Sequence, residues 1–248
     1  WMAKRMINTS EKATDFINYF DKLAQERVNL DGPDWFKKAK SASLNRFTDL
    51  GVPTVKDEEW KYTNLSPLLK TKFHACQENT LTEKDGLKNY LSPDEIALVF
   101  INGHFSAELS QLTNLPKGLI VSSLNEALNT HSDDLQAHHT KYEPQEASTF
   151  ISLNDAMSDS GAYIKINKNT SIERLIHLVH VTSSSNGEMF SLPRTYITVE
   201  KSAEATLLES NISFTNSMTY FTNALTDIFL DENANLHYCK AQQESLEA

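Results

Sequence analysis

Two stretches with helical spacing of apolar residues open the chain. In the first, one apolar face is formed by Phe16, Phe20, Leu23 and Ala24, which follow the i, i+4, i+7, i+8 rule. Ser10 is the expected N-cap of this helix. A second apolar face runs over residues 35–47, and Gly51 with Pro53 should end it, because glycine accepts a left-handed cap and proline restrains the residue before it. The first fifty residues therefore predict a pair of helices.

Further along the chain, apolar residues recur at every second position, as in a strand, and no longer with helical spacing. The apolar run Ala97–Ile101 and the short run His104–Ser106 flank Asn102-Gly103, a dipeptide that tolerates the positive φ angles of a tight turn. A β-hairpin is therefore expected at this position. Four further elements are expected nearby: a short strand over 70–76, a strand over 118–121, a short capped helix over 123–128 and an exposed loop over 129–146.

The last third of the sequence contains an internal repeat. The pattern Ile164-x-Ile166-x-x-x-Thr170-x-Ile172 recurs from Ile197 and again from Ile228, at offsets of 33 and 31 residues. Each copy is an apolar strand of period two, then a polar corner, then a second strand of the same kind. The corners hold Asn169, Ser202 and Asn233.

This repeat indicates an architecture of stacked strands, because a repeat of about 20–50 residues is typical of solenoids and propellers. The period of two excludes a helical repeat, and a propeller blade needs about 40–45 residues and four strands. We therefore predict a mainly β protein, with an N-terminal helical region and connector over 1–92 and a β-helix domain over 93–248. The alternative is that three similar strands occur by chance in a Thr-rich β protein.

Composition narrows the class of protein further. The chain has 248 residues, 40% of them hydrophobic, and a net charge of −10, so it can build a core and is not disordered. A pI near 5.3 argues against a nucleic-acid partner. No apolar run approaches the ~20 residues that span a bilayer, so no membrane partner is expected. Two cysteines exclude a disulfide framework and favour a reduced, cytoplasmic protein.

Two pairs of residues could ligate a metal ion. His74 with Cys76, and His237 with Cys239, each place two side chains on the same face of a strand. A zinc site needs three or four ligands, and the repeat directs His237 and Cys239 outward. We favour ordinary surface positions and assign no metal ligand, although the sequence alone leaves metal binding by these pairs open.

Further histidines give no stronger signal. His177 and His180 are three residues apart, so on a strand they lie on opposite faces and cannot share one metal ion. His138 and His139 fall in the expected polar loop, where a solvated side chain is the simplest interpretation.

The sequence also lacks a recognisable reaction centre. It contains no Gly-x-Ser-x-Gly elbow and no glycine-rich phosphate loop. The carboxylate pairs Asp133-Asp134 and Asp231-Glu232 fall in expected loops or corners, where they should be solvated. We therefore predict that the chain is not an enzyme and assign no catalytic residue and no cofactor-binding residue.

One segment carries a specific resemblance. An acidic pair followed by Trp60-Lys61-Tyr62-Thr63 comes just after Gly51-Val52-Pro53, and this order of residues is unusual. Further matching segments follow, at Phe100–Phe105, Leu115–Leu124, Leu153–Met157 and Tyr220–Thr226. In this order the segments resemble the SufB/SufD family, and within it the SufD members, which belong to the Suf machinery for iron–sulfur cluster assembly.

The resemblance extends from about residue 10 to the end and implies the same helical region and β-helix. It implies a non-catalytic scaffold subunit that works with SufB and with the ATPase SufC, and an iron–sulfur cluster only in the assembled complex. Family members continue further, so it implies a β-helix truncated before the regions that contact SufB and SufC. No family functional residue maps onto this chain.

Two expectations remain. The open end of a truncated β-helix should promote self-association into a homo-oligomer, because unpaired strand edges recruit other chains. The alternative function, from another class, is a β-helix enzyme or binding protein that acts on polysaccharide. Such an enzyme would need carboxylates clustered on one outward strand face, and the sequence does not show such a cluster.

Overall fold

The computed structural model describes residues 2–27, 32–76, 84–141, 148–183, 188–214 and 219–246. The chain is mixed α/β, with N-terminal helices followed by several β-sheets, about 33% helix and 32% strand. The expectation of a mainly β protein is therefore wrong, because helices also occupy part of the later sequence. Two compact units form, Trp1–Phe73 with His131–Ser158, and His74–Thr130 with Asp159–Ala248. The predicted domain boundary at residues 92 and 93 stays a prediction.

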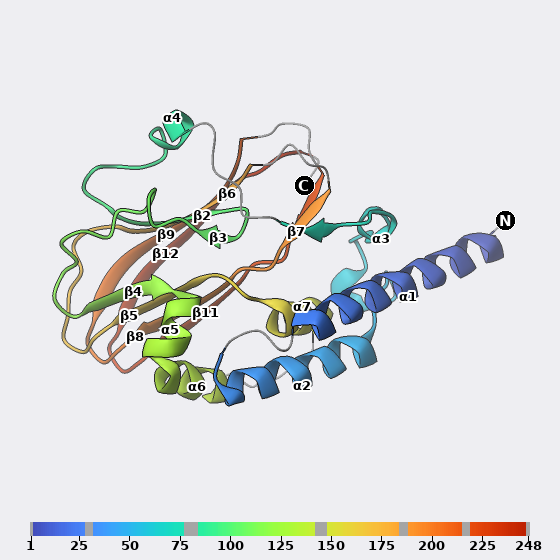
Figure 1. Ribbon diagram of the computed structural model, residues 1–248, viewed down its shortest axis with the longest axis horizontal. Coiled ribbons are helices and arrows are strands. Elements are labelled where there is room, and N and C mark those ends of the chain that lie inside the picture. The colour runs from blue at the N-terminus through green and yellow to red at the C-terminus, as the bar shows by residue number, and fades with distance from the viewer. Residues whose placement is uncertain are drawn as a thin grey trace. The chain divides into compact units, whose positions relative to one another are not determined.

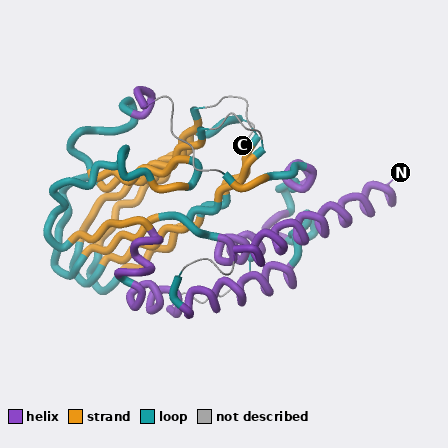
Figure 2. The backbone as a smooth tube through the Cα atoms, in the orientation of Figure 1, coloured by secondary structure: helices purple, strands orange, loops and turns teal. Residues whose placement is uncertain are grey.

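The first unit is helical, and we call it the helical unit (Figures 1 and 2). Phe16, Phe20 and Ala24 are buried as the helical spacing predicts. The N-cap prediction at Ser10 is wrong, because the helix already begins at Met2. Gly51 ends the second helix at a φ of 66°, as expected. The elements of this unit are α1 (Met2–Arg27), α2 (Asp34–Leu50), η1 (Glu58–Trp60), α3 (Ser66–Lys70), α6 (Ser132–Lys141) and α7 (Thr149–Met157).

The exposed loop expected over 129–146 is wrong where the structure describes it, up to residue 141. Helix α6 occupies most of this stretch, and Leu135 and His138 are buried on one face of it. Its single narrow apolar face explains why the sequence looks polar. The indole Nε1 of Trp35 donates to Ser132 Oγ at 2.9 Å, and the Trp35 ring lies 5.8 Å from the ring of His139. His138 and His139 are therefore packed residues of the helical unit.

In the second unit, which we call the sheet unit, the described residues form three sheets, whose strands Figure 1 labels. Their strand orders are β1-β7-β10, β11-β8-β5-β4 and β12-β9-β6-β2-β3. The strands are β1 (His74–Ala75), β2 (Ile96–Ile101), β3 (His104–Phe105), β4 (Leu119–Ser123), β5 (Ala162–Ile166), β6 (Ile176–Thr182), β7 (Met189–Ser191), β8 (Arg194–Val199), β9 (Glu204–Ser213), β10 (Tyr220–Thr222), β11 (Leu225–Leu230) and β12 (Asn235–Gln243). Two short helices accompany them, α4 (Lys84–Leu87) and α5 (Leu124–Thr130).

The repeat predicted from sequence is present as strand pairing in register. Ile164 on β5, Ile197 on β8 and Ile228 on β11 are Cα partners in parallel pairs. The second strands of the second and third copies pair in the same way, with Leu236 on β12 opposite Ala205 on β9. In the first copy the expected second strand at Thr170–Ile172 is reduced to an isolated bridge between Ser171 and Glu204. The three corner residues all adopt the left-handed conformation that asparagine tolerates best among non-glycine residues: Asn169, Ser202 and Asn233, at φ angles of 59°, 56° and 55°. The spacing and the corners of the repeat are confirmed.

The hairpin is confirmed as well. Strands β2 and β3 pair antiparallel with Phe100 opposite Phe105, and the turn residues Asn102 and Gly103 have φ angles of 52° and 88°. The capped helix is also present, since the amide of Glu126 donates to Ser123 Oγ at 3.2 Å. The strand expected over 118–121 is β4. Only His74 and Ala75 form a strand within the expected stretch 70–76.

An apolar core of the sheet unit lies between the four-stranded and the five-stranded sheets. It takes its side chains from both, since Ile164 and Ile197 come from one sheet and Ile176 and Leu178 from the other. Leu236 and Tyr238 on β12 pack against this core, so they face inward as the repeat predicts. Among the described residues, no helix combines the length and the apolar character that a membrane-spanning segment requires.

Candidate functional site

The interior of the sheet unit changes from apolar to polar along strand β9. Successive side chains of a strand alternate between its faces, so Ala205, Leu207, Glu209 and Asn211 share one face. Ala205 and Leu207 belong to the apolar core. Glu209 and Asn211 continue the same row and remain buried, at 1% and 3% exposure. A carboxylate and an amide therefore lie where the preceding positions hold apolar side chains.

The Glu209 carboxylate is held by groups from β11 and β12. Tyr238 Oη donates to its Oε2 at 2.7 Å, and Thr226 Oγ1 donates to the same oxygen at 2.9 Å. Lys240 Nζ lies 2.8 Å from Oε1, and Lys240 is the neighbour of Glu209 in the parallel ladder. A buried carboxylate requires such partners, because an unpaired buried charge is strongly destabilising.

These contacts explain the titration of the cluster. Burial by itself would raise the pKa of Glu209, but the charges of His180 and Lys240 and the hydrogen bonds from Lys240 and Tyr238 outweigh it and lower the pKa to about 2. Burial and the hydrogen bond to this carboxylate raise the pKa of the Tyr238 hydroxyl. At neutral pH the cluster therefore holds a carboxylate and a protonated phenol.

His180 lies on β6 and faces the same interior. Its ring stacks on Phe100, with centroids 5.0 Å apart. Burial lowers the pKa of His180 to about 4, and the attraction of Glu209 only partly offsets that effect. The imidazole is therefore neutral at physiological pH. Among the described residues, neither His180 Nδ1 nor Asn211 Nδ2 has a hydrogen-bond partner.

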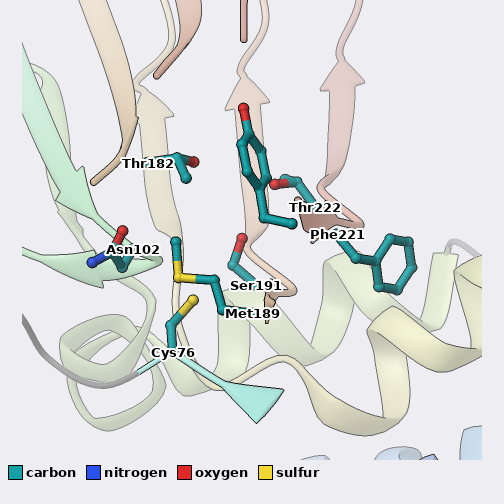
Figure 3. Close-up of a pocket in the computed structure, with 8 residues that line it drawn as sticks. Cys76, Asn102, Thr182, Met189, Ser191, Phe221 and Thr222 are labelled. Atoms are coloured by element: carbon teal, nitrogen blue, oxygen red, sulfur yellow. The ribbon is translucent and has the colours of Figure 1, made fainter. Parts of the chain in front are cut away.

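Two small hollows open beside this cluster. Figure 3 shows the first, in which the sulfur atoms of Cys76 and Met189 point toward one another while Phe221 points away. The second is lined by His180 and Asn211, among others, and shares Thr182, Ser191 and Thr222 with the first. Side chains fill both so closely that the second has room for about one water molecule. Neither hollow could admit an organic substrate without rearrangement of the surrounding side chains.

A second buried network lies on the opposite face of the five-stranded sheet. His177 Nδ1 lies 3.1 Å from Glu95 Oε1, and His177 Nε2 lies 2.8 Å from Ser210 Oγ. An acid, a histidine and a serine in this order resemble a nucleophilic triad. All three are buried, with Ser210 only 6% exposed, and they connect β6 and β9 with the residue just before β2. The network joins neighbouring strands and does not present a serine to solvent.

The other candidates from the sequence are dispersed. His177 and His180 lie on opposite faces of β6, as predicted. His237 and Cys239 are exposed on the outward face of β12, also as predicted. His74 is exposed on β1, and the carbonyl of Cys76 lies 3.3 Å from His104 Nε2.

Over the described part of the chain, no three His, Cys, Asp or Glu side chains gather as a metal site would require. The assignments of no catalytic, cofactor or metal residue stay predictions.

Sequence reasoning missed the cluster around Glu209. The one signal available was the alternation of side chains along a strand, which places Glu209 on the same inward face as Ala205 and Leu207. Its partners Thr226 and Tyr238 come from two other strands, so only the register of the sheets brings them together.

The fold and this site define a class of protein, in which N-terminal helices come before mostly parallel sheets that enclose a partly polar interior. Comparison with known families agrees with this description. Residues 10–178 match the family described as SufBD protein N-terminal region. Residues 180–248 match the SufBD core domain of the SUF system for FeS cluster assembly.

Individual relatives support the same assignment. An iron–sulfur cluster assembly SufBD family protein of Synechocystis sp. is 30% identical over 205 residues, which is 79% of this chain and 45% of the relative. SufD of Escherichia coli is 28% identical over 82% of this chain and 45% of its own length. SufD of Bacillus subtilis is 22% identical over 90% and 51%. The chain belongs to the SufBD family of SUF-system iron–sulfur cluster assembly proteins, and it spans about half the length of these relatives.

Proposed function

We propose that this chain is part of a SufD-like subunit that serves as a non-catalytic scaffold in iron–sulfur cluster assembly. The observation that carries the proposal is the order of the family matches, because the N-terminal region and the core domain follow one another from residue 10 to residue 248. Two of the relatives are named SufD, and this supports the SufD branch over SufB.

The scaffold in this proposal is a β-helix. Strands separated by one repeat pair in parallel and in register, and a left-handed corner residue recurs in each copy. Stacked coils of this kind share one continuous interior. In the same proposal, residues 1–92 form the helical region with its connector and residues 93–248 belong to the β-helix domain.

The chemistry of the interior supports a structural role. Glu209 is engaged by Tyr238, Thr226 and Lys240, and the buried Arg194 forms an ion pair with Asp227 on the neighbouring strand. Both networks tie strands of successive coils together. In this proposal, ATP hydrolysis belongs to the partner SufC, the nascent cluster forms in the assembled complex with SufB, and the complex works in the reducing cytoplasm.

The test is co-purification. The full-length gene product, tagged and co-expressed with SufB and SufC of the same organism, should retain both proteins through a high-salt wash. ATP hydrolysis should depend on SufC, so a SufC variant without its phosphate-binding lysine should abolish hydrolysis and still bind. A full-length protein that elutes alone, or that hydrolyses ATP without SufC, would overturn the proposal.

A further inference from the structure

Two buried polar atoms border the second hollow beside the Glu209 cluster. In the described part of the chain, neither Nδ1 of His180 nor Nδ2 of Asn211 has a hydrogen-bond partner, and both residues line this hollow. His180 on β6 and Asn211 on β9 are Cα partners in a parallel ladder, so their side chains extend into the interior side by side. They are 9% and 3% exposed. Because an unsatisfied buried polar group is destabilising, we expect the hollow to hold a partner that serves both.

The hollow is too small for a polyatomic ligand, because it has room for about one water molecule. Three residues with hydroxyl groups also line it, and Figure 3 labels them where the two hollows meet: Thr182, Ser191 and Thr222. A hydroxyl group rotates to donate or to accept, and a buried water usually makes about three hydrogen bonds. The two nitrogen atoms and one hydroxyl group are therefore enough to hold a single water molecule.

The charges around the hollow favour a neutral occupant. The Glu209 carboxylate, which is charged at neutral pH, interacts electrostatically with His180, and a carboxylate this close disfavours an anion. A cation would face the N–H groups of the Asn211 amide, which are donors. The described residues also bring no three His, Cys, Asp or Glu side chains together to coordinate a metal ion. An uncharged molecule that both donates and accepts hydrogen bonds fits the hollow, and at this size that molecule is water.

We propose that the second hollow is a binding site for one water molecule, which bridges His180 Nδ1 and Asn211 Nδ2 as a permanent part of the interior. The Asn211 amide donates to the water oxygen. With the imidazole proton on Nε2, the water donates one hydrogen to Nδ1 and keeps the other for a hydroxyl group of the wall. The water links β6 to β9 and continues the polar row that Glu209 begins on β9. This site stands independently of the proposed scaffold role.

Crystallography and water relaxation measurements test the site. A high-resolution crystal structure of the chain should show one peak of density within about 2.7–3.2 Å of both nitrogen atoms. Crystals soaked in sodium bromide should give no anomalous peak at this position, because the carboxylate of Glu209 disfavours an anion. Magnetic relaxation dispersion of the water signal counts buried waters with long residence times. This count should fall by one in Asn211→Leu, which removes the amide and keeps a side chain of similar size.

The matched control is Thr206→Val, because Thr206 is exposed on the opposite face of the same strand. Its variant should keep the wild-type count, and circular dichroism checks that both variants are folded. Wild-type density without this peak, or a bromide peak in its place, would overturn the site without the need for any variant. A folded Asn211→Leu that keeps the same water would show that the amide does not hold it and would overturn the bridge.

Discussion

Glu209 shows how a charged side chain is accommodated inside a row of apolar residues. Its carboxylate is 1% exposed and receives hydrogen bonds from Tyr238 and Thr226, with Lys240 close to the other oxygen. Tyr238 and Lys240 lie on β12, the strand that pairs with β9, whereas Thr226 lies on β11 of the four-stranded sheet, so the carboxylate connects the two sheets. Removing it leaves the partly buried Tyr238 phenol and Thr226 hydroxyl without this acceptor.

Glu209→Ala is therefore expected to lower the free energy of unfolding by about 2–3 kcal/mol, the range for a hydrogen-bonded charged group whose partners stay buried. Glu209→Gln should cost less, since the amide oxygen still accepts from Tyr238. Urea unfolding followed by circular dichroism measures both. Glu204→Gln, at an exposed position of the same strand, is the control and should change stability by less than about 0.5 kcal/mol. Equal effects of Glu209→Ala and the control would contradict this account.

The two depressed pKa values predict acid sensitivity. His180 has a folded-state pKa of about 4 against an ordinary value of 6.5, so the unfolded chain takes up the proton first, and stability falls as the pH drops from 6.5 to 4. Glu209 has a folded-state pKa of about 2 against an ordinary value of 4.5. Its contribution to the free energy of unfolding is therefore complete above about pH 4.5 and is lost as the pH falls below that value. Both groups destabilise the protein in acid.

Urea midpoints between pH 8 and pH 4 measure this effect. The loss from His180 alone should be on the order of 3 kcal/mol, because one pKa unit corresponds to about 1.4 kcal/mol. His180→Gln should remove most of the loss of stability between pH 6.5 and pH 4.5, and the decline in stability below pH 4.5 should remain. An unchanged profile in the variant would show that other groups govern the acid transition.

At the scale of elements, the repeat positions are equivalent in sequence but differ in burial. Ile164 and Ile197 are fully buried, whereas Ile228 on the edge strand β11 is 38% exposed. Ile197→Ala should therefore cost about 3 kcal/mol, within the usual range for a buried isoleucine, and Ile228→Ala about 1 kcal/mol. Thermal and urea unfolding of the two variants give the comparison. Equal costs would mean that the stacking of β11 on β8 is tighter than the structure shows.

The stacked strands could be predicted from sequence because their signal is local and repeated. A period of two, a left-handed corner at Asn169, Ser202 and Asn233, and an Asn-Gly turn each need only a few residues to be recognised. Helix α6 was not predicted, since it has one narrow buried face at Leu135 and His138 and is otherwise polar. Tertiary packing, including the contact of Trp35 with His139, stabilises it beyond what its composition indicates.

The site was less predictable than the fold. The inward position of Glu209 follows from the strand period, but its partners depend on the register between sheets. The pairing of His177 with Glu95 and Ser210 depends on the same register. The sequence did separate His177 from His180 correctly, because that separation needs only the strand period.

At the scale of the whole molecule, the edges of the described sheets are expected to govern association. Strands β11 and β12 lie at the ends of their sheet orders, and the inward-facing Ile228 and Leu230 on β11 are 38% and 48% exposed. Unpaired edges with apolar side chains recruit other chains.

The 248-residue chain should therefore self-associate with rising concentration, as light scattering would detect. The double variant Ile228→Lys, Leu230→Lys should shift it toward the monomer, because inward-pointing lysines on an edge strand oppose pairing with another chain. A matched control is Lys168→Ala, at an exposed corner of an earlier copy, which should leave association unchanged. A wild-type chain that stays monomeric at every concentration would show that its own residues cover these edges.

The central claim is that this SufBD family chain belongs to a scaffold subunit of a Suf assembly. Native mass spectrometry of the full-length protein, mixed with purified SufB and SufC, tests it most directly. The account predicts one complex that contains all three proteins, and the complex should remain when the SufC phosphate-binding lysine is replaced. Spectra that show the full-length protein only by itself, beside a complete SufB–SufC complex, would contradict it.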